Sequence, residues 1–378
     1  MLGSHYDFRI LNMLAAYDWQ VKNLAIKPSF NYRHAVYDDT PYFDGTRSGL
    51  INARRTISDL AASLQADWLA GPLRLIAALR VGKFNVPDKT YFSYQGIVNY
   101  KIKSNHLLRA SYAYAQRGEF VTNLFTKHQT LFSVDNQGIN FVEATVNGNP
   151  NLDLIEATTW EAGYRWQVSD KFRLDGEVFL STMENFSFFV NRLTSDPTMP
   201  SSLTVLFDRQ NIDLKAEQVG ATFSAEFSSP RLTLKPFVTW QRTQIFNYSP
   251  FTLAQESDPT GTENISIQQD ISNYKATPAI YGGLYSNIIF SSRFNLNLNS
   301  YFFSSHQISH RVDTSPGYEP SPANIPTKML LNVKLSYKPI TQMNLYFNLR
   351  NLLGQRGIEY YHTDRIGSSL LGGITYDF

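Results

Sequence analysis

The chain has 378 residues, a formal net charge of +2 and no cysteine. This length accommodates either several soluble domains or one large β-barrel. The near-zero charge and the lack of a Lys/Arg cluster argue against a nucleic-acid partner, and the lack of cysteine excludes disulfides and thiolate chemistry. Aromatic residues are 14% of the chain and charged residues only 17%, against roughly 25% charged residues in soluble domains. The composition therefore favours a surface that meets an apolar solvent.

The sequence has the pattern of long strands. No apolar run reaches the roughly 18 residues of a membrane helix, and polar and apolar residues alternate along much of the chain. We predict about fifteen strands of roughly 10 to 20 residues, longer than the strands of about 5 or 6 residues in soluble sheets and long enough to cross a bilayer at a tilt. In chain order they span residues 5–17, 22–37, 55–70, 72–86, 90–103, 105–118, 153–168, 170–190, 203–229, 231–247, 271–291, 292–307, 326–338, 340–352 and 367–378.

The connections between these strands alternate in length. Tight links occur at every second junction, at Ala70-Gly71-Pro72, Lys103-Ser104-Asn105, Ser169-Asp170, Ser229-Pro230 and Pro339-Ile340. The other junctions are mostly long and span residues 38–54, 119–152, 191–202, 248–270, 308–325 and 353–366. Short periplasmic turns and long external loops are typical of outer-membrane barrels. We therefore predict that 119–152 and 308–325 lie at one end of the sheet, opposite the tight links.

The alternation predicts which face of a strand meets lipid. Between Gln342 and Arg350, one face carries Met343, Leu345, Phe347 and Leu349. We predict that these side chains point outward and that Asn348 and Arg350 point inward, within three consecutive antiparallel strands over residues 326–378. Trp19, Trp68 and Trp166 lie within a few residues of tight links, where an interfacial aromatic girdle is expected.

Strand direction predicts an incomplete barrel. If Phe378 ends a strand at the periplasmic side, an odd count makes the first strand run in the same direction as the last, whereas complete bacterial barrels have an even number of strands. No export signal is recognisable, because the first residues already alternate and include Asp7 and Arg9. We expect residues 1–378 to be one domain, the C-terminal portion of an outer-membrane barrel. Its sheet should stay open or close only by an unusual parallel pairing.

The last strand has a distinctive end. Residues 367–378 place Leu370, Ile374, Tyr376 and Phe378 on one face, and the chain ends on an aromatic residue. A terminal aromatic residue on an alternating strand resembles the signal by which outer-membrane barrels are recognised for assembly. We therefore predict that Tyr376 and Phe378 form an assembly signal.

Three segments resemble the TonB-dependent receptor family. Asn149-Pro150-Asn151-Leu152, followed by Glu156, Glu161, Gly163 and Tyr164, is similar to the family's NP-x-L…E…E-x-G-Y stretch, with Ile155 where proline is usual. Asn351-Leu352-Leu353-Gly354, followed by Tyr360 and Tyr361, resembles the penultimate strand and its loop, although Arg365-Ile366-Gly367 replaces the common Gly-Arg. Asn211-Ile212-Asp213 resembles the segment before another strand. The motifs span 149–378, and the strand pattern extends the resemblance to the rest.

The resemblance implies an outer-membrane receptor that contacts membrane lipid and is inserted by the barrel-assembly machinery. Such receptors have about 22 strands and a plug in the lumen. They bind a scarce or bulky substrate, small or oligomeric, at the outer face and import it when TonB pulls on the plug. No plug, TonB-contacting segment or first strands are recognisable here. TonB would act through that missing plug, so we expect this chain alone not to carry out energised transport.

The sequence points to binding and not to catalysis. It has no HExxH, GxSxG, GxGxxG or P-loop pattern, and we predict no enzyme activity, no cofactor and no metal site. His306 and His310 would stand about 13 Å apart on an extended chain, too far to chelate one ion. Aromatic side chains that are suited to stacking on a ligand lie in the long loops, at Tyr42, Phe43, Phe120, Phe125, Tyr318, Tyr360 and Tyr361.

Two alternatives to a TonB-dependent receptor remain. A passive outer-membrane pore or structural barrel shares the strand pattern, and differs in lacking a plug and a TonB-contacting segment. A soluble β-sandwich binding module also has alternating strands, but such a module needs no detergent.

Overall fold

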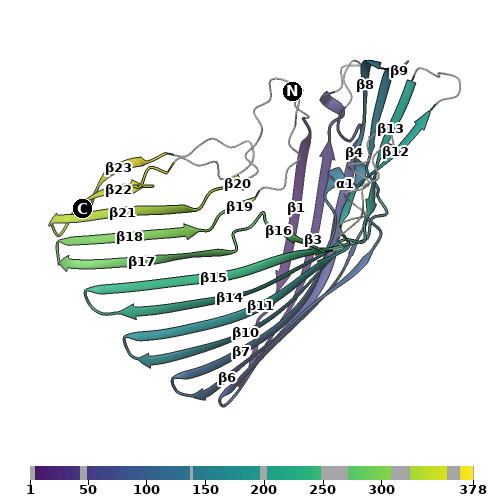
Figure 1. The fold of residues 1–378 in the computed structure, drawn as a ribbon. Helices are drawn as coiled ribbons and strands as arrows, with labels where there is room; N and C mark the ends of the chain where they lie inside the picture. Colours follow the sequence, from purple (N-terminus) through teal and green to yellow (C-terminus); the bar gives the residue numbers. More distant parts are fainter. Residues whose placement is uncertain are drawn as a thin grey trace.

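The computed structural model describes residues 5–42, 49–136, 139–195, 202–247, 271–307, 324–355 and 367–377. Its main feature is one strongly curved sheet of seventeen strand segments (Figure 1). These make fifteen crossings, because β1 (Asp7–Ala16) and β2 (Trp19–Val21) both pair with β3, and β16 (Ile271–Tyr274) and β17 (Ile280–Ser291) both pair with β15. The other members are β3 (Leu24–Asp38), β4 (Arg54–Ala70), β5 (Leu73–Phe84), β6 (Thr90–Lys103), β7 (His106–Arg117), β10 (Ile155–Ser169), β11 (Phe172–Glu184), β14 (Lys215–Ser228), β15 (Leu232–Phe246), β18 (Phe294–Phe303), β21 (Lys328–Ile340), β22 (Met343–Arg350) and β23 (Ser369–Tyr376).

Neighbouring strands of this sheet are antiparallel, and they follow one another in chain order apart from the insertions described below. The fifteen predicted strands and the all-β class are therefore confirmed. Within the described residues, β1 pairs only with β3 and β23 pairs only with β22, so the sheet is open between its first and last strands (Figure 1).

Turns of two or three residues join the strands at one end of the sheet, which we call the short-turn end. Lys22-Asn23 and Gly71-Pro72 are two of them, and Gly71 adopts a φ of 56°, which costs glycine little because it has no Cβ. The prediction of a tight link at Pro339-Ile340 was wrong. β21 continues through Ile340, and the turn is Thr341-Gln342. Pro339 lies in an irregularity of the β21–β22 pairing, where a missing backbone N–H is tolerated.

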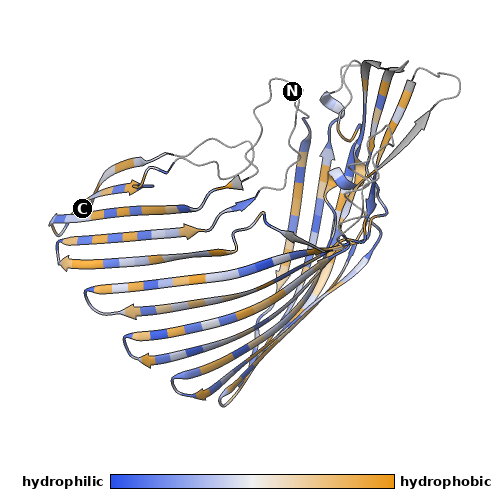
Figure 2. Cartoon of the chain, in the orientation of Figure 1, coloured by the Kyte–Doolittle hydropathy of each residue, from blue (hydrophilic) through white to orange (hydrophobic). Residues whose placement is uncertain are grey.

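Hydrophilic and hydrophobic residues alternate along many of the strands (Figure 2), and successive residues of a strand face opposite sides of the sheet. Phe347 and Leu345 pair across β22 and β23 with Gly372 and Ile374, and Phe347 and Ile374 are 56% and 68% exposed. The pairing register can be traced from β22 through each neighbouring strand to β10, and it places this apolar row on the same face as Tyr164. We call it the outer face and the opposite one the inner face. The predicted three strands and their face assignment are thus confirmed for the described part of 326–378.

The predicted girdle tryptophans lie on the outer face near the short-turn end. Trp68 of β4 pairs with Leu24 and Leu75, and Trp166 of β10 pairs with His106 at the start of β7. Trp19, Trp68 and Trp166 are all exposed. Their amphipathic rings therefore occupy the level at which a bilayer interface is expected.

A second sheet stands at the other end, which we call the long-loop end. It contains β8 (Lys127–Asn136), β9 (Ile139–Asn147), β12 (Ser187–Ser195) and β13 (Ser202–Asn211), in the order β12-β13-β9-β8, with β13 parallel to β9. We call it the external sheet. A two-stranded pair, β19 (His306–Gln307) and β20 (Asn324–Ile325), lies at the same end.

The external sheet corrects three sequence-based boundaries. The predicted strand 170–190 is two strands, β11 and β12, and the predicted strand 203–229 is also two, β13 and β14. Apolar residues continue on both sides of each break, which conceals the breaks in the sequence. The first break falls at Asn185, which turns the chain with a φ of 62°. The predicted loop 119–152 contains the helix α1 (Val121–Phe125) and the β8–β9 hairpin. It does lie opposite the short turns, as predicted, whereas most of 308–325 lies outside the described residues. No helix in the described ranges is long and apolar enough to cross a membrane.

Burial concentrates at the base of the external sheet. Leu152, the leucine of the NP-x-L motif, is fully buried, as are Ile51 and Leu124 of α1. Asp39, which follows β3, is also fully buried, and its carboxylate accepts hydrogen bonds from the backbone N–H groups of Ile51, Asn52 and Ala53 at 2.7, 3.0 and 3.0 Å. This carboxylate therefore fixes the segment that leads into β4.

We predict that Asp39→Ala loosens this segment. Three backbone donors would lose a charged acceptor, and unsatisfied buried donors cost about 1–3 kcal/mol each. Amide hydrogen exchange at Ile51 and Ala53 should accelerate by roughly tenfold or more. The matched control is Asp38→Ala, because the carboxylate of half-buried Asp38 accepts hydrogen bonds only from neighbouring Thr40 among the described residues. Equal exchange rates in the two variants would contradict the role of Asp39.

Candidate ligand-binding site

A cavity of about 570 Å³ opens on the inner face at the long-loop end. We call it the mouth cavity. Strands β3 to β7 supply its wall, and the chain between β7 and α1 closes one side. Its polar lining includes three arginines and two acids, and its aromatic lining includes Tyr6, Tyr37, Phe84, Tyr91 and Phe120.

Arg80 and Tyr91 form the floor of the mouth cavity. The Arg80 Nε donates to the Tyr91 hydroxyl at 2.9 Å, and its Nη2 lies 3.1 Å from Asp59 Oδ2. Tyr91 is only 3% exposed, and its ring stacks on Phe84 with centroids 4.9 Å apart. Gly82 makes room for this arrangement, because a Cβ there would collide with the Tyr91 ring. The floor is therefore held rigidly by packing and charge together.

Two cations of the mouth cavity are available to a ligand. Arg33 of β3 and Arg117 of β7 are exposed, and among the described residues neither takes part in an ion pair. The Arg117 guanidinium lies 4.9 Å from the centroid of the Phe120 ring, a cation–π geometry. A second polar feature is Asp59 Oδ1, which is buried and lacks a hydrogen-bond partner in the described part of the chain. The cavity thus offers positive charge, an aromatic surface and one acceptor.

Glu119 connects the mouth cavity to the external sheet. Its buried carboxylate accepts from Asn123 of α1 at 2.6 Å and from the Ser187 hydroxyl of β12 at 2.7 Å. Arg209 of β13 donates to the same hydroxyl at 3.1 Å and covers the Phe189 ring at 4.7 Å. Burial lowers the pKa of Arg209, and the nearby Glu119 charge opposes this shift. One acid therefore joins the helix, both strands of the β12–β13 hairpin and the cavity wall.

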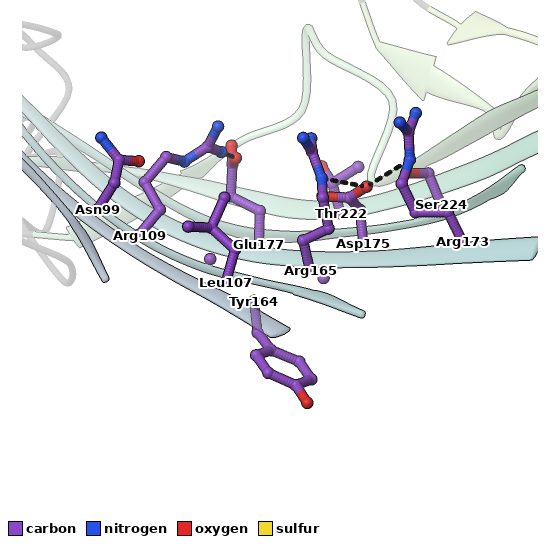
Figure 3. A pocket seen from close by; sticks show the side chains of 12 residues that line it. Asn99, Leu107, Arg109, Tyr164, Arg165, Arg173, Asp175, Glu177, Thr222 and Ser224 are labelled. Atoms are coloured by element: carbon purple, nitrogen blue, oxygen red, sulfur yellow. Dashed lines mark hydrogen bonds and ion pairs between the residues drawn. The ribbon is translucent and has the colours of Figure 1, made fainter. Parts of the chain in front are cut away.

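The inner face continues toward the short-turn end as a charged wall (Figure 3). Arg165 Nε lies 2.9 Å from Asp175 Oδ1, and Arg173 Nε lies 3.4 Å from Asp175 Oδ2. Arg173 also pairs with Glu226, which pairs in turn with Lys235 at 2.9 Å. Arg165, Arg173 and Asp175 border a polar cavity of about 440 Å³, whereas the Tyr164 ring points away from it to the opposite side of the sheet. An apolar occupant is excluded from this wall by the cost of covering charged groups.

The structure places the predicted ligand-contacting aromatics in different surroundings. Phe120 lines the mouth cavity, and Phe125, at the end of α1, packs under the Arg55 guanidinium at 5.1 Å outside the lining. Tyr42 donates to Asp7 Oδ1 at 2.7 Å, a bond that raises the pKa of Tyr42 above its usual range. Phe43, Tyr318, Tyr360 and Tyr361 lie outside the described residues, as does Phe378 of the predicted assembly signal. Tyr376 is exposed and pairs with Met343.

Sequence reasoning missed the residues that form most of the cavity. Arg33, Asp59, Arg80 and Tyr91 are strand residues, and the search for ligand contacts considered only loops. The available signal was the alternation itself, because Arg80 stands between the exposed apolar residues Leu79 and Val81 and must therefore face inward.

The curved antiparallel sheet, apolar on its outer face and charged on its inner face, defines the wall of a transmembrane β-barrel. A family model described as "TonB dependent receptor-like, beta-barrel" matches residues 4–352. The chain belongs to this family, whose members are outer-membrane receptors of Gram-negative bacteria. No curated protein matches the chain in sequence.

Solved structures of siderophore and iron receptors share the fold. A variant of the ferric enterobactin receptor PfeA from Pseudomonas aeruginosa has a TM-score of 0.73 at 12% identity, over 99% of this chain and 54% of that one. The siderophore receptor PirA from Acinetobacter baumannii gives 0.69 at 11%, over 99% and 55%. The FrpB iron transporter from Neisseria meningitidis gives 0.67 at 13%, over 99% and 56%. The chain spans about half the length of these proteins, and identities this low show the fold alone.

We predict that Gly82→Ala destabilises the sheet by about 1–3 kcal/mol, the usual cost of overpacking. The added methyl group must displace the Tyr91 ring, which Arg80 and Phe84 hold in place. Gly96→Ala in β6 is the matched control, because a Cβ at Gly96 meets nothing within 4 Å. The free energy of unfolding in denaturant measures both. A loss at Gly96 equal to that at Gly82 would refute the steric explanation.

Proposed function

We propose that this chain supplies the wall and external loops of a TonB-dependent receptor that captures an anionic substrate at the outer face of the outer membrane. The mouth cavity carries this proposal. Arg33 and Arg117 present guanidinium groups without ion-pair partners among the described residues, and guanidinium is suited to recognise carboxylate, catecholate or phosphate oxygens. Phe120 and Tyr37 add aromatic surface for a flat organic ligand.

The substrate class that fits this lining is an anionic metal chelate of the siderophore type. A large apolar ligand is disfavoured by three arginines and two acids in the lining. The structural neighbours include receptors named for siderophores, ferric enterobactin and iron, which makes a siderophore chelate the first substrate to test. We also propose that the predicted loop aromatics Tyr42, Phe43, Phe125, Tyr318, Tyr360 and Tyr361 contact the substrate.

We predict that Arg33→Ala and Arg117→Ala each weaken binding of ferric enterobactin, the chosen probe, by roughly tenfold or more. A hydrogen bond to a charged group contributes about 1.5–3 kcal/mol, and 1.4 kcal/mol is a factor of ten. Titration calorimetry with the purified chain measures the affinity. Arg231→Ala is the control, because Arg231 is exposed at the short-turn end, far from the cavity. Equal affinities in the three variants would reject the mouth cavity as the binding site.

Membrane placement makes a separate prediction. Phe347→Arg puts a charge on the outer face, and an arginine at the bilayer midplane costs about 2–4 kcal/mol in barrels. Asn348→Arg places the same side chain on the inner face, where the neighbouring strand already carries the charged Lys334, and should cost much less. Unfolding of the chain in lipid vesicles with urea compares the two. Similar losses from both substitutions would contradict bilayer contact at Phe347.

Energised import requires more than this wall. We propose that a plug and a TonB-contacting segment act with it, that the assembly machinery recognises the last strand through Tyr376 and Phe378, and that this chain alone does not accumulate substrate. Uptake of radioactive iron chelate in cells that lack the native receptor tests the last point. TonB-dependent accumulation by this chain alone would overturn it. Accumulation that persists without TonB would favour the alternative of a passive pore.

A further inference from the structure

The segment between β7 and α1 lines the mouth cavity without belonging to the sheet. Residues 117–122 all border the cavity, yet residues 118–120 lie in neither a strand nor a helix. Arg117, the last residue of β7, carries the guanidinium that we propose to contact the substrate, and this group lies over the Phe120 ring. The direction of both side chains depends on what anchors the two residues between them.

Gly118 anchors this segment on the floor of the mouth cavity. A Cβ at Gly118 would lie 3.1 Å from the Phe84 ring, closer than most Cβ atoms pack. Phe84 in turn stacks on the buried ring of Tyr91. The lack of a side chain at Gly118 therefore lets the backbone pass close to the rigid floor.

Glu119 anchors the segment a second time, to an element that is distant in the sequence. Its Oε1 accepts a hydrogen bond at 2.7 Å from the hydroxyl of Ser187, which is 68 residues away at the start of β12. Its Oε2 accepts from the side-chain amide of Asn123 in α1 at 2.6 Å. Arg209 of β13 donates to the same Ser187 hydroxyl at 3.1 Å. Both carboxylate oxygens of Glu119 thus have a donor.

An acid is unexpected in the lining of a site for anions, because like charges brought together oppose binding. Glu119 is only 7% exposed, and each of its carboxylate oxygens already accepts a hydrogen bond. Its charge is therefore directed at protein donors, and it offers little surface to a ligand. A role that fits these contacts acts through the neighbouring residues in the chain.

We propose that Glu119 is a positioning residue, which holds residues 117–120 so that Arg117 and Phe120 face the substrate. This inference rests on the proposed capture of an anionic substrate in the mouth cavity. A guanidinium that is already in place needs no further ordering when the substrate binds, and such preorganisation increases affinity. Because Ser187 belongs to β12, the external sheet shapes a cavity to which its described residues contribute no lining.

Titration calorimetry with ferric enterobactin and the purified chain tests this role. Glu119→Ala removes both hydrogen bonds, and it should weaken binding by roughly fivefold because the segment must then be ordered by the substrate. Glu119→Gln should stay within about twofold of the unaltered chain, since its amide oxygen can accept from Asn123 and its N–H can donate to the Ser187 oxygen. Equal losses in Glu119→Ala and Glu119→Gln would overturn positioning by these hydrogen bonds.

The matched control is Asp88→Ala, which removes an acid that is exposed, pairs with Lys83 and lies outside the lining of the mouth cavity. This variant should bind ferric enterobactin as the unaltered chain does. A loss of affinity as large as that of Glu119→Ala would attribute the effect to the charge removed and would overturn the positioning role.

A double-mutant cycle separates positioning from a general loosening of the fold. In a chain that already carries Arg117→Ala and Phe120→Ala, Glu119→Ala should change the affinity by less than about twofold, because the side chains through which it acts are gone. In an Arg33→Ala chain it should still weaken binding by roughly fivefold, since Arg33 is fixed by the pairing of β3 with β1 and β4. Equal losses in both backgrounds would overturn the positioning role.

The same measurements distinguish this inference from the proposed function. If Arg33→Ala and Arg117→Ala bind as tightly as Arg231→Ala, the mouth cavity is not the substrate site, and the role of Glu119 is rejected with it. If the two arginine variants lose affinity while Glu119→Ala does not, the substrate site stands and the positioning role alone is overturned.

Discussion

The structure depends on the pairing of backbone N–H and C=O groups across fifteen consecutive strand crossings. Burial is sparse in the described residues and gathers at the base of the external sheet, so the main sheet has no large apolar core of its own. In hydrocarbon, each unpaired backbone group costs several kcal/mol. Continuous backbone pairing therefore stabilises this sheet, as an apolar core stabilises a soluble domain. Because the backbone supplies this stability, the side chains of both faces are available for contacts with lipid or ligand.

The alternation of side chains gives the two faces of the sheet different chemistry. Because successive residues face opposite sides, Tyr164 and Arg165 stand next to each other in sequence and on opposite sides of the sheet. One strand thereby contributes an aromatic ring to the lipid-facing surface and a guanidinium to the charged wall.

The fold could be predicted from the sequence to a larger extent than the site. Strand positions follow from period-two alternation and from tight links, both of which are local. One local break was missed: β11 and β12 separate at Asn185, which has a positive φ, and the predicted strand 170–190 runs across it. The mouth cavity depends on Arg80 meeting Asp59 and Tyr91 across three strands. Such contacts require the register, which one sequence without its structure does not supply. Among the cavity residues, only Phe120 was predicted from the sequence, because it lies in the loop that closes the cavity.

The two open edges restrict how copies of this chain can meet. With fifteen crossings, β1 and β23 run in the same direction, and every copy inserted the same way in a bilayer presents identical edge directions. Two copies placed edge to edge would have to pair in parallel, and an antiparallel seam would require one of them to be upside down. Exposed strand edges are ordinarily a route to aggregation. Among the described strands, a shared direction of insertion therefore leaves only parallel pairing, the slightly weaker arrangement, to the edges of two copies.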